Sequence, residues 1–383
     1  MSRLLFTLAF ALCFTTPLLA DEKPKANTLT PKEIADGWIL LFDGETPFGW
    51  ELHPESKGKL KTEGGKLLLQ GDEGHAFLRF KPPIPWYYEL TANFEVEGQA
   101  GLENVWKSHR DLRSIEPLPK VSGFRVVYAP PDHPDYKLLH HTQWTGSTGN
   151  VVLEDKKKIG QGCGIMRGPS LSFSVSKGSR LVLSDVKLRP INTKPLYNGK
   201  NLDGWKVTQT DPKRTATKFE VTPTGELSAK NGPGDLQTEK QFDDFVLQFE
   251  CKTNGLALNS GIFFRCMPDA YQNGYEAQIQ NAYLGDRTKP IDYGTGAIYR
   301  RIAARKVVSN DNEWFTMTVA ARGAHIATWV NGYQTVDWTD DRKANENPRQ
   351  GLRTAKGHLS IQGHDPTTDL LFRNIRIAEL PKP

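Results

Sequence analysis

A motif that occurs twice constrains the fold of this chain more than any other feature of the sequence. Its first copy spans residues 41–50, where Leu-Phe-Asp-Gly is followed by Gly-Trp, and its second copy spans residues 196–205, 155 positions later. The two copies also end alike, because Leu-Ser-Asp-Val-Lys-Leu at 183–188 matches Phe-Arg-Asn-Ile-Arg-Ile at 372–377. A repeat of this length, matched at both ends, predicts two copies of one fold.

The repeat sets the expected domain boundaries. We expect one domain at 37–190 and a second at 195–380, joined by a short polar stretch flanked by prolines. A length of 383 residues agrees with two domains. In each domain the tryptophan that closes the opening motif, Trp50 or Trp205, is expected to pack beside the first strand.

Alternating apolar and polar residues predict strands in both halves. Residues 245–251 and 261–265 alternate in this way, and Asn331-Gly332 separates two further alternating runs, which is a strong signal for a hairpin turn. The 34 glycines and 25 prolines fit a chain with many turns better than a helical bundle. The chain is therefore expected to be all-β, an antiparallel sandwich or jelly roll, with one short helix capped by Thr30.

The first twenty residues have the character of an export signal. Arg3 precedes an apolar run at 4–14, and a small residue, Ala20, ends the segment. We expect 1–20 to be a signal peptide and 21–36 an N-terminal linker, which would make the protein secreted or periplasmic. Retention as an N-terminal anchor is the alternative, and no later apolar run is long enough to span a membrane.

Charge and cysteine content exclude some functions. The formal charge of +5 comes from basic residues spread along the chain, without a basic stripe and interleaved aromatics, so nucleic acid is not the expected partner. Beyond the signal, Cys163, Cys251 and Cys266 remain, with no Cys-x-x-Cys spacing for a thiolate metal site. Cys251 and Cys266 could form a disulfide in an exported protein, but buried free thiols are the favoured interpretation.

The second half resembles the 3-keto-disaccharide hydrolase family, whose domain is a concanavalin-like jelly roll found in secreted bacterial proteins. The resemblance depends on the order of several segments and not on one motif. These segments are Leu196–Trp205, Asn259–Arg265, Gly274–Ile279, Thr295–Tyr299, Asn312–Phe315, Val330–Gly332, Gly357–His364 and Phe372–Ile377. The first half carries only the opening and closing segments, like a degenerate copy. The resemblance implies two tandem concanavalin-like jelly-roll domains in a carbohydrate-active protein.

One expected strand of the second half carries polar residues in a regular pattern. In residues 275–280, strand alternation places Glu276, Gln278 and Gln280 on one face and apolar residues on the other. A retaining glycosidase of the laminarinase type needs two carboxylates about 5 Å apart, and here only Glu276 is acidic. Conventional double-displacement hydrolysis is therefore disfavoured, and an exposed polar strand face remains the alternative.

Further positions complete the expected site. Arg265 ends an apolar strand and could stabilise a developing enolate oxygen with its charge. His364 ends another strand on the same side as Gln362 and has the pKa needed for proton transfer near neutrality. Glu276 and His364 could also hold a divalent ion together. The residues expected to contact the substrate are Gln278, Gln280, Gln362 and Asn259, although Asn259 could simply cap a turn.

The resemblance implies a chemistry that a sparse site could perform. A glycoside oxidised at ring carbon 3 has an acidified hydrogen at carbon 2, and one base can remove it. The enolate then expels the carbon 1 substituent and water adds back, which gives net hydrolysis. Glu276 or His364 is the expected base and Arg265 the expected enolate stabiliser. A sugar 3-dehydrogenase would act upstream to supply the oxidised substrate.

The first half departs from this pattern. Aligning Gly123-Phe124 with Gly274-Tyr275 places Arg125 at the position of Glu276, and no counterpart of Asn259–Arg265 is present. The leading hypothesis is thus a 3-keto-glycoside hydrolase or lyase with its site in the second half. A lectin-like carbohydrate-binding protein without turnover is the second hypothesis, and a conventional glycoside hydrolase is the third.

Overall fold

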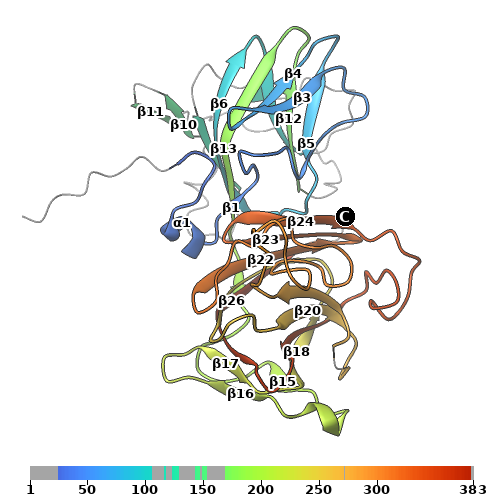
Figure 1. The fold of residues 1–383 in the computed structure, drawn as a ribbon. Helices are drawn as coiled ribbons and strands as arrows, with labels where there is room; N and C mark the ends of the chain where they lie inside the picture. Colours follow the sequence, from blue (N-terminus) through green and yellow to red (C-terminus); the bar gives the residue numbers. More distant parts are fainter. Residues whose placement is uncertain are drawn as a thin grey trace, which may run out of the picture.

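The computed structural model describes residues 25–105, 116–117, 123–128, 143–146, 149–152, 169–270 and 272–380, with side chains for 25–100, 171–270 and 272–380. Its regular secondary structure is almost entirely β-strand, as the sequence predicted (Figure 1). The exceptions are the helix α1 (Pro31–Ala35) and a 3-10 turn at Pro212–Arg214. Strands of the described ranges form four antiparallel sheets, two from each half. The predicted signal peptide lies outside those ranges.

The first half contributes a large and a small sheet. The large sheet has the order β11 (Gly149–Val152), β10 (Gln143–Gly146), β9 (Gly123–Tyr128), β6 (Tyr88–Glu97), β13 (Arg180–Pro190), β4 (Lys66–Gln70) and β3 (Lys59–Glu63), with β1 (Ile39–Leu40) also on β13. The small sheet has the order β2 (Trp50–Leu52), β5 (Ala76–Phe80), β12 (Pro169–Val175), β7 (Ala100–Val105) and β8 (Glu116–Pro117). Leu, Phe and Val side chains of both sheets share one core.

The second half repeats this arrangement. Its large sheet has the order β16 (Lys218–Val221), β17 (Leu227–Lys230), β26 (Asp369–Glu379), β19 (Phe245–Thr253), β22 (Trp314–Arg322), β23 (His325–Val330) and β24 (Tyr333–Thr339), with β14 (Lys194–Pro195) also on β26. Its small sheet has the order β15 (Trp205–Val207), β18 (Gly234–Phe242), β25 (Gly357–Gly363), β20 (Ser260–Cys266) and β21 (Tyr275–Ile279). Strand for strand, the two halves have the same topology, so the sequence repeat is a structural repeat.

Local features explain how these strands form. Phe245, Leu247 and Phe249 alternate into the core between the two sheets of the second half. Asn331 and Gly332 both adopt positive φ, 48° and 77°, and turn β23 into β24 as the Asn-Gly pair predicted. The short helix also forms as predicted, since the Thr30 side chain accepts the backbone N–H of residue 33 in a capping box.

The two repeated tryptophans occupy equivalent places. Trp50 and Trp205 are 5% and 6% exposed, and each lies in the edge strand of a small sheet. The indole Nε1 of Trp50 donates to the carbonyl of Leu41, and that of Trp205 donates to the carbonyl of Leu196 at 3.0 Å. Each ring therefore ties the opening motif to its sandwich, which confirms the predicted packing.

The predicted alignment of the two halves around Glu276 is wrong. Arg125 lies on β9, which pairs with β6 in the large sheet and corresponds to β22. Glu276 lies on β21 in a small sheet, and the strand at that place in the first half is β8. The Gly-aromatic pair that suggested the alignment is too short a pattern to distinguish two strands in different sheets.

The two halves are joined by more than their connecting segment. Trp329 of β23 is fully buried among core side chains of the first half, and its Nε1 donates to the carbonyl of Leu40 at 3.0 Å. Arg305 forms an ion pair with Asp43 at 2.9 Å, and Lys81 forms one with Asp337 at 2.8 Å. The outward face of the second large sheet is therefore an interface with the first half.

For the cysteines and the helices of the described residues, the sequence made two predictions. Cys251 and Cys266 are both buried and free, which agrees with the favoured interpretation and not with a disulfide. Cys163 lies outside the described residues. None of the helices in the described part of the chain has the length and apolar character needed to cross a bilayer.

Candidate functional site

The outer face of the small sheet in the second half carries buried polar side chains. On β21, Tyr275, Ala277 and Ile279 point into the core, so Glu276 and Gln278 point to the opposite face, as the sequence predicted. Both of these polar side chains are nevertheless buried, at 4% and 1% exposure. The strand face is therefore neither core nor open surface, which is what a lined site requires.

Strand register shows which residues share this face. Phe263 of β20 is the cross-strand partner of Glu276, and Gly261 is the partner of Gln278. On β25 and β18, Gln362 is the partner of Asp235. Ile361 of β25 is the partner of Ile262, so Gln362 lies opposite Gly261. Directly opposed residues in a sheet project to the same side. The row across the four strands is therefore Asp235, Gln362, Gly261 and Gln278.

Glu276 has room on this face because its neighbour lacks a side chain. A Cβ atom at Gly261 would lie 2.8 Å from Cγ and 2.8 Å from Oε1 of Glu276, so the carboxyl group extends over the glycine. Oε2 of Glu276 accepts from Nη1 of Arg349 at 3.4 Å, a long contact, and no residue of the described chain donates to Oε1. Burial raises the pKa of Glu276 to about 8, although the charge of Arg349 opposes the increase.

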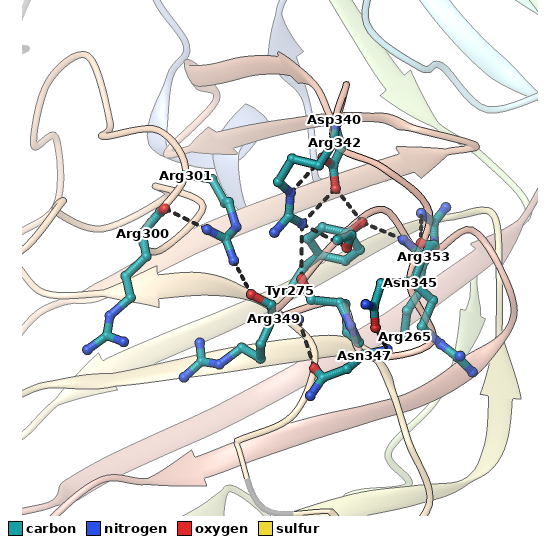
Figure 2. Close-up of polar contacts among 12 residues, drawn as sticks. Arg265, Tyr275, Arg300, Arg301, Asp340, Arg342, Asn345, Asn347, Arg349 and Arg353 are labelled. Atoms are coloured by element: carbon teal, nitrogen blue, oxygen red, sulfur yellow. Dashed lines mark hydrogen bonds and ion pairs between the residues drawn. The ribbon is translucent and has the colours of Figure 1, made fainter.

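Arg349 comes from the long loop between β24 and β25. Its backbone N–H donates to Oδ1 of Asn347 at 2.9 Å, and its carbonyl accepts from Nη2 of Arg301 at 2.6 Å (Figure 2). The guanidinium lies over the ring of Phe263, 5.6 Å from the centroid. The loop thus holds a cation against the face that carries Glu276.

The same loop is anchored at its start by a second arginine. Arg342 forms an ion pair with Asp340 and donates to the carbonyls of Pro348 and Gly351 at 3.0 and 2.9 Å (Figure 2). Asp340 also accepts the Tyr275 hydroxyl at 2.7 Å. These contacts fix the loop on the sheet, so the position of Arg349 does not depend on its contact with Glu276 alone.

Asp235 supplies a second buried carboxyl group. Its side chain is fully buried, Oδ2 accepts the backbone N–H of Gln272 at 2.8 Å, and Oδ1 has no hydrogen-bond partner among the described residues. Burial raises its pKa to about 7, and the charge of Arg349 acts in the opposite direction. The Cα atoms of Asp235 and Gly261 lie two strands apart, at about 10 Å. Because the Glu276 carboxyl group extends over Gly261, the carboxyl groups of Asp235 and Glu276 share this face.

Two glutamines on this sheet face have side-chain oxygens without a hydrogen-bond partner. Nε2 of Gln278 donates to the carbonyl and to Oδ2 of Asp292, at 3.1 and 3.2 Å. Its Oε1 is buried without a partner in the described structure, and so is Oε1 of Gln362. A buried polar atom without a partner is costly. Together with Oδ1 of Asp235, these atoms are acceptors that the described protein leaves unused on this face.

Two of the residues expected to contact substrate have protein partners instead. Gln280 uses both ends of its amide, because Nε2 donates to the carbonyl of Ala257 at 3.2 Å and Oε1 accepts the N–H of Ala282 at 3.1 Å. Asn259 donates to Oδ2 of Asp292 at 3.0 Å. In this structure both residues support the loops beside the site.

Arg265 does not face Glu276, and its expected role as enolate stabiliser needs correction. Its φ is 54° and the register shifts between β20 and β25 at this point, so strand alternation breaks. The fully buried guanidinium donates to the carbonyls of Asp243, Gly323 and Arg353 and to the carboxylate of Asp244, at 2.6–3.0 Å. Arg265 therefore joins three turns, and Arg349 is the cation beside Glu276.

We expect Arg265→Met to destabilise the fold by about 3 kcal/mol or more, because it leaves a buried carboxylate and three carbonyls short of donors. Urea unfolding followed by circular dichroism measures this loss. Arg180→Met is the matched control, since the Arg180–Glu97 pair is exposed and is expected to contribute about 1 kcal/mol at most. An Arg265→Met protein of unchanged stability would contradict the structural role.

His364 is not brought next to Glu276. The register places Ser360 opposite Phe263 and Phe263 opposite Glu276, and His364 lies four residues beyond Ser360. The two Cα atoms are therefore about 16 Å apart, at about 3.3 Å per residue and about 4.8 Å per strand. Its Nδ1 contacts Oδ2 of Asp365 at 2.8 Å.

The separation also bears on the expected divalent ion. Glu and His side chains cannot together cover about 16 Å and still place both ligand atoms about 2 Å from one ion. No group of three or more His, Cys, Asp or Glu side chains suited to a metal occurs in the described part of the chain. The residues present thus do not fit an ion shared by Glu276 and His364.

Sequence reasoning missed Asp235 and Arg349. Asp235 carried a weak signal, since it alternates with Leu236 in a strand as Glu276 alternates with Ala277. Only the sheet order shows that its strand adjoins the site, because β18 and β21 are separated by β25 and β20. Arg349 lies in a loop without periodicity and carried no signal.

Comparison with known proteins agrees with the sequence resemblance. Residues 192–378 match the sequence model of a family described as a 3-keto-alpha-glucoside-1,2-lyase-like domain. No curated protein matches the chain.

Solved structures of similar architecture each cover about half of the chain. A candidate glycosyl hydrolase from Parabacteroides distasonis is 27% identical, with a TM-score of 0.39, over 49% of this chain and 100% of its own. A second such protein from that organism is 21% identical, with a TM-score of 0.40, over 49% and 94%. The carbohydrate-binding module CBM66 of Bacillus subtilis is 16% identical, with a TM-score of 0.33, over 46% and 95%.

Proposed function

Because residues 192–378 form a 3-keto-alpha-glucoside-1,2-lyase-like domain, we propose that the chain cleaves 3-keto-glycosides by elimination at carbons 1 and 2, followed by addition of water. One observation links this reaction to particular residues. Glu276 presents an oxygen without a protein partner beside the guanidinium of Arg349, on a buried polar face. A base next to a fixed cation is what enolate formation requires.

Glu276 is the proposed base. Its ionised carboxylate takes the proton from ring carbon 2, and the carbon–hydrogen electron pair moves to form the enolate of the carbon 3 ketone. Burial favours this chemistry because it raises the pKa of Glu276 to about 8, nearer to that of the carbon acid than an exposed carboxyl group would be. The glycine at position 261 leaves the space that the carboxyl group needs.

Arg349 is the proposed enolate stabiliser. Carbon 2 and the carbon 3 oxygen are close neighbours in the sugar, so a group that binds this oxygen must lie beside the base. Arg349 meets that condition, since its Nη1 contacts Oε2 of Glu276 at 3.4 Å. Its backbone is held by Arg301 and Asn347 before any ligand binds, and such preorganised charge is efficient in stabilising a transition state.

Asp235 is the proposed acid for the leaving group. The enolate electrons return to the carbon 3 carbonyl, a double bond forms between carbons 1 and 2, and the carbon 1–oxygen bond breaks. Protonated Asp235 donates its proton to the departing oxygen, and water then adds to carbon 1 while carbon 2 regains a proton. The charge of Asp235 contributes to the raised pKa of Glu276, so the two groups titrate as a pair, and the active form is the one in which Glu276 is ionised and Asp235 holds the proton.

Asp235 also favours a second candidate function. Strand alternation predicted only one acid for a conventional glycoside hydrolase, but a second carboxyl group, that of Asp235, lies on the same sheet face. The Cα atoms of Asp235 and Gly261 are about 10 Å apart, which leaves room for the carboxyl groups of Asp235 and Glu276 to have the spacing of about 6.5–9.5 Å used by inverting hydrolases. Hydrolysis of the unoxidised glycoside is therefore the alternative activity.

The decisive experiment compares oxidised and native substrates. We expect the purified protein to release the aglycone from a 3-keto-glucoside, with a 1,2-unsaturated or hydrated keto sugar as the second product, and to leave the parent glucoside intact. Chromatography and mass spectrometry of the products measure this. Cleavage of the parent glucoside alone would favour the conventional hydrolase, and binding of the keto sugar without product would favour the lectin-like alternative. A parallel reaction with a chelator tests for a divalent ion.

The proposal also implies a partner reaction and a place in the cell. The ketone at carbon 3 has to be introduced before this step, so a sugar 3-dehydrogenase is the expected supplier of the substrate. Export by the predicted signal at 1–20 would put the chain in the secreted or periplasmic space, where glycosides from outside the cell are available.

A further inference from the structure

We propose that Arg300 forms, beside Arg349, a subsite for a carboxylate carried by the sugar substrate, as in a uronic acid residue. The inference deepens the proposed function, because it names a substrate class for the same site. It does not concern the enolate, which belongs to Arg349 and Glu276. Arg300 and Arg349 come from segments 49 residues apart, and what brings them together is a third arginine.

Arg301 holds the backbones of both neighbouring arginines. Its Nη1 donates to the carbonyl of Arg300 at 3.1 Å, and its Nη2 donates to the carbonyl of Arg349 at 2.6 Å. Figure 2 shows the side chains of Arg300 and Arg349 extending toward the same side from the two backbones that Arg301 binds. A buried or half-buried guanidinium with a fixed donor geometry is well suited to positioning two chain segments.

Arg300 lies directly beside the site. The backbone N–H of Tyr299, the preceding residue, donates to the carbonyl of Glu276 at 3.0 Å. The Arg300 guanidinium lies over the Tyr299 ring, 5.4 Å from the centroid, and Tyr299 packs edge-on against Tyr293 at 5.3 Å. Stacking and a side-chain hydrogen bond with Tyr299 restrict the exposed arginine, and its remaining edge donors can bind a planar anion.

Among the described residues Arg300 has no acidic partner, unlike the nearby Arg342 and Arg353. Arg342 is paired with Asp340 and Arg353 with Glu346, whereas no carboxylate of the described residues lies within 4.0 Å of the Arg300 guanidinium. Its backbone has a φ of 58°, which is unfavourable for a residue with a side chain. An unpaired arginine held in a strained turn beside a reactive carboxyl group indicates a role in binding.

The local charge favours an anion over a neutral sugar. Arg301 is bound by carbonyls and not by a carboxylate. Within the described part of the chain, the three arginines therefore have Glu276 as their only direct acidic partner. Burial raises the pKa of that carboxyl group to about 8, so near neutral pH it carries less negative charge than an exposed glutamate. A single guanidinium group can bind a carboxylate through two parallel N–H bonds, a geometry that a hydroxyl group cannot match.

Equilibrium binding of simple sugars by the full-length protein tests the inference without turnover. By isothermal titration at low ionic strength, we expect D-glucuronate to bind about tenfold more tightly than D-glucose. Arg300→Gln should weaken glucuronate binding about tenfold and leave glucose binding unchanged, and Arg300→Lys should restore part of it. Lys343→Gln removes an exposed charge from the loop that carries Arg349 and should change either constant less than about twofold.

Several outcomes would overturn the inference. These are equal affinity of the wild-type protein for glucuronate and glucose, unchanged glucuronate binding by Arg300→Gln, and sulfate binding as tightly as glucuronate, which would mean that the sugar is not recognised. Turnover of a neutral 3-keto-glucoside separates the two proposals. If turnover is present and glucuronate preference absent, only the subsite is wrong, and the reverse result contradicts only the proposed reaction.

Discussion

Glu276→Gln is expected to lower the turnover of a 3-keto-glucoside by about 10²–10⁴-fold, because an amide cannot take the proton from carbon 2. The substitution keeps the size of the side chain and its place over Gly261, so the dissociation constant of the substrate should change only a few-fold. Single-turnover kinetics measures the chemical step, and titration of the inactive variant measures binding. Glu239→Gln changes an exposed acid on β18 of the same sheet, so it is the matched control and should keep the full rate.

The pH dependence gives a second readout of the same variant. Wild-type turnover should be highest between about pH 7 and 8, where Asp235 and Glu276 together hold one proton, and should fall on both sides. Glu276→Gln should remove this bell shape from the residual rate. A Gln variant with wild-type turnover, or a wild-type profile that is flat from pH 5 to 9, would exclude Glu276 as the base.

Stability should respond to the same group. The pKa of Glu276 is raised from 4.5 to about 8 on folding, so the folded state retains a proton that the unfolded state releases. Folding stability should therefore fall as pH rises from about 4.5 to about 8. Glu276→Gln removes its share of this fall, which urea unfolding at several pH values measures.

Arg349→Met should lower turnover by about 10²–10³-fold, since it removes the charge beside the enolate oxygen but keeps a side chain that can cover Phe263. It should also raise the pKa of Glu276 further, because the charge of Arg349 now lowers that pKa. The rate maximum should then shift to higher pH. Arg349→Lys should recover part of the rate, as it restores the charge without the planar geometry.

Lys343→Met is the matched control for Arg349→Met, because it removes an exposed charge from the same loop. We expect it to leave both turnover and the pH of the maximum unchanged. Wild-type turnover by Arg349→Met would contradict the proposed enolate stabiliser. Equal losses in both variants would mean that the loop, and not the guanidinium, matters.

The sequence predicts the strands well because each strand has one face in a core. Alternation of this kind places Glu276 and Gln278 correctly on the face away from the core, since nothing interrupts β21. The same rule fails for Arg265, where a positive φ and a register shift break the alternation. One bulge is enough to turn a predicted site residue into a buried connector of turns.

The remaining site residues depend on contacts that a local pattern does not contain. Asp235 adjoins the site because β18 pairs with β25, which lies more than a hundred residues later. Arg349 is placed by hydrogen bonds from Asn347 and Arg301 within irregular loops. His364, by contrast, had the right chemistry for a base, but it lies four residues beyond Ser360, just past the end of β25, and is out of reach.

The burial of Trp329 in the core of the first half makes the first half a cover for the large sheet of the second. A sandwich that exposed this ring with Val246 and Ala327 would present an apolar sheet face to water. The first half covers that face from within the same chain, so the molecule is in effect an intramolecular dimer. Its association does not depend on protein concentration. A copy that lacks the strand sequence bearing Glu276 can thus be retained for contact alone, while the proposed chemistry belongs to the other copy.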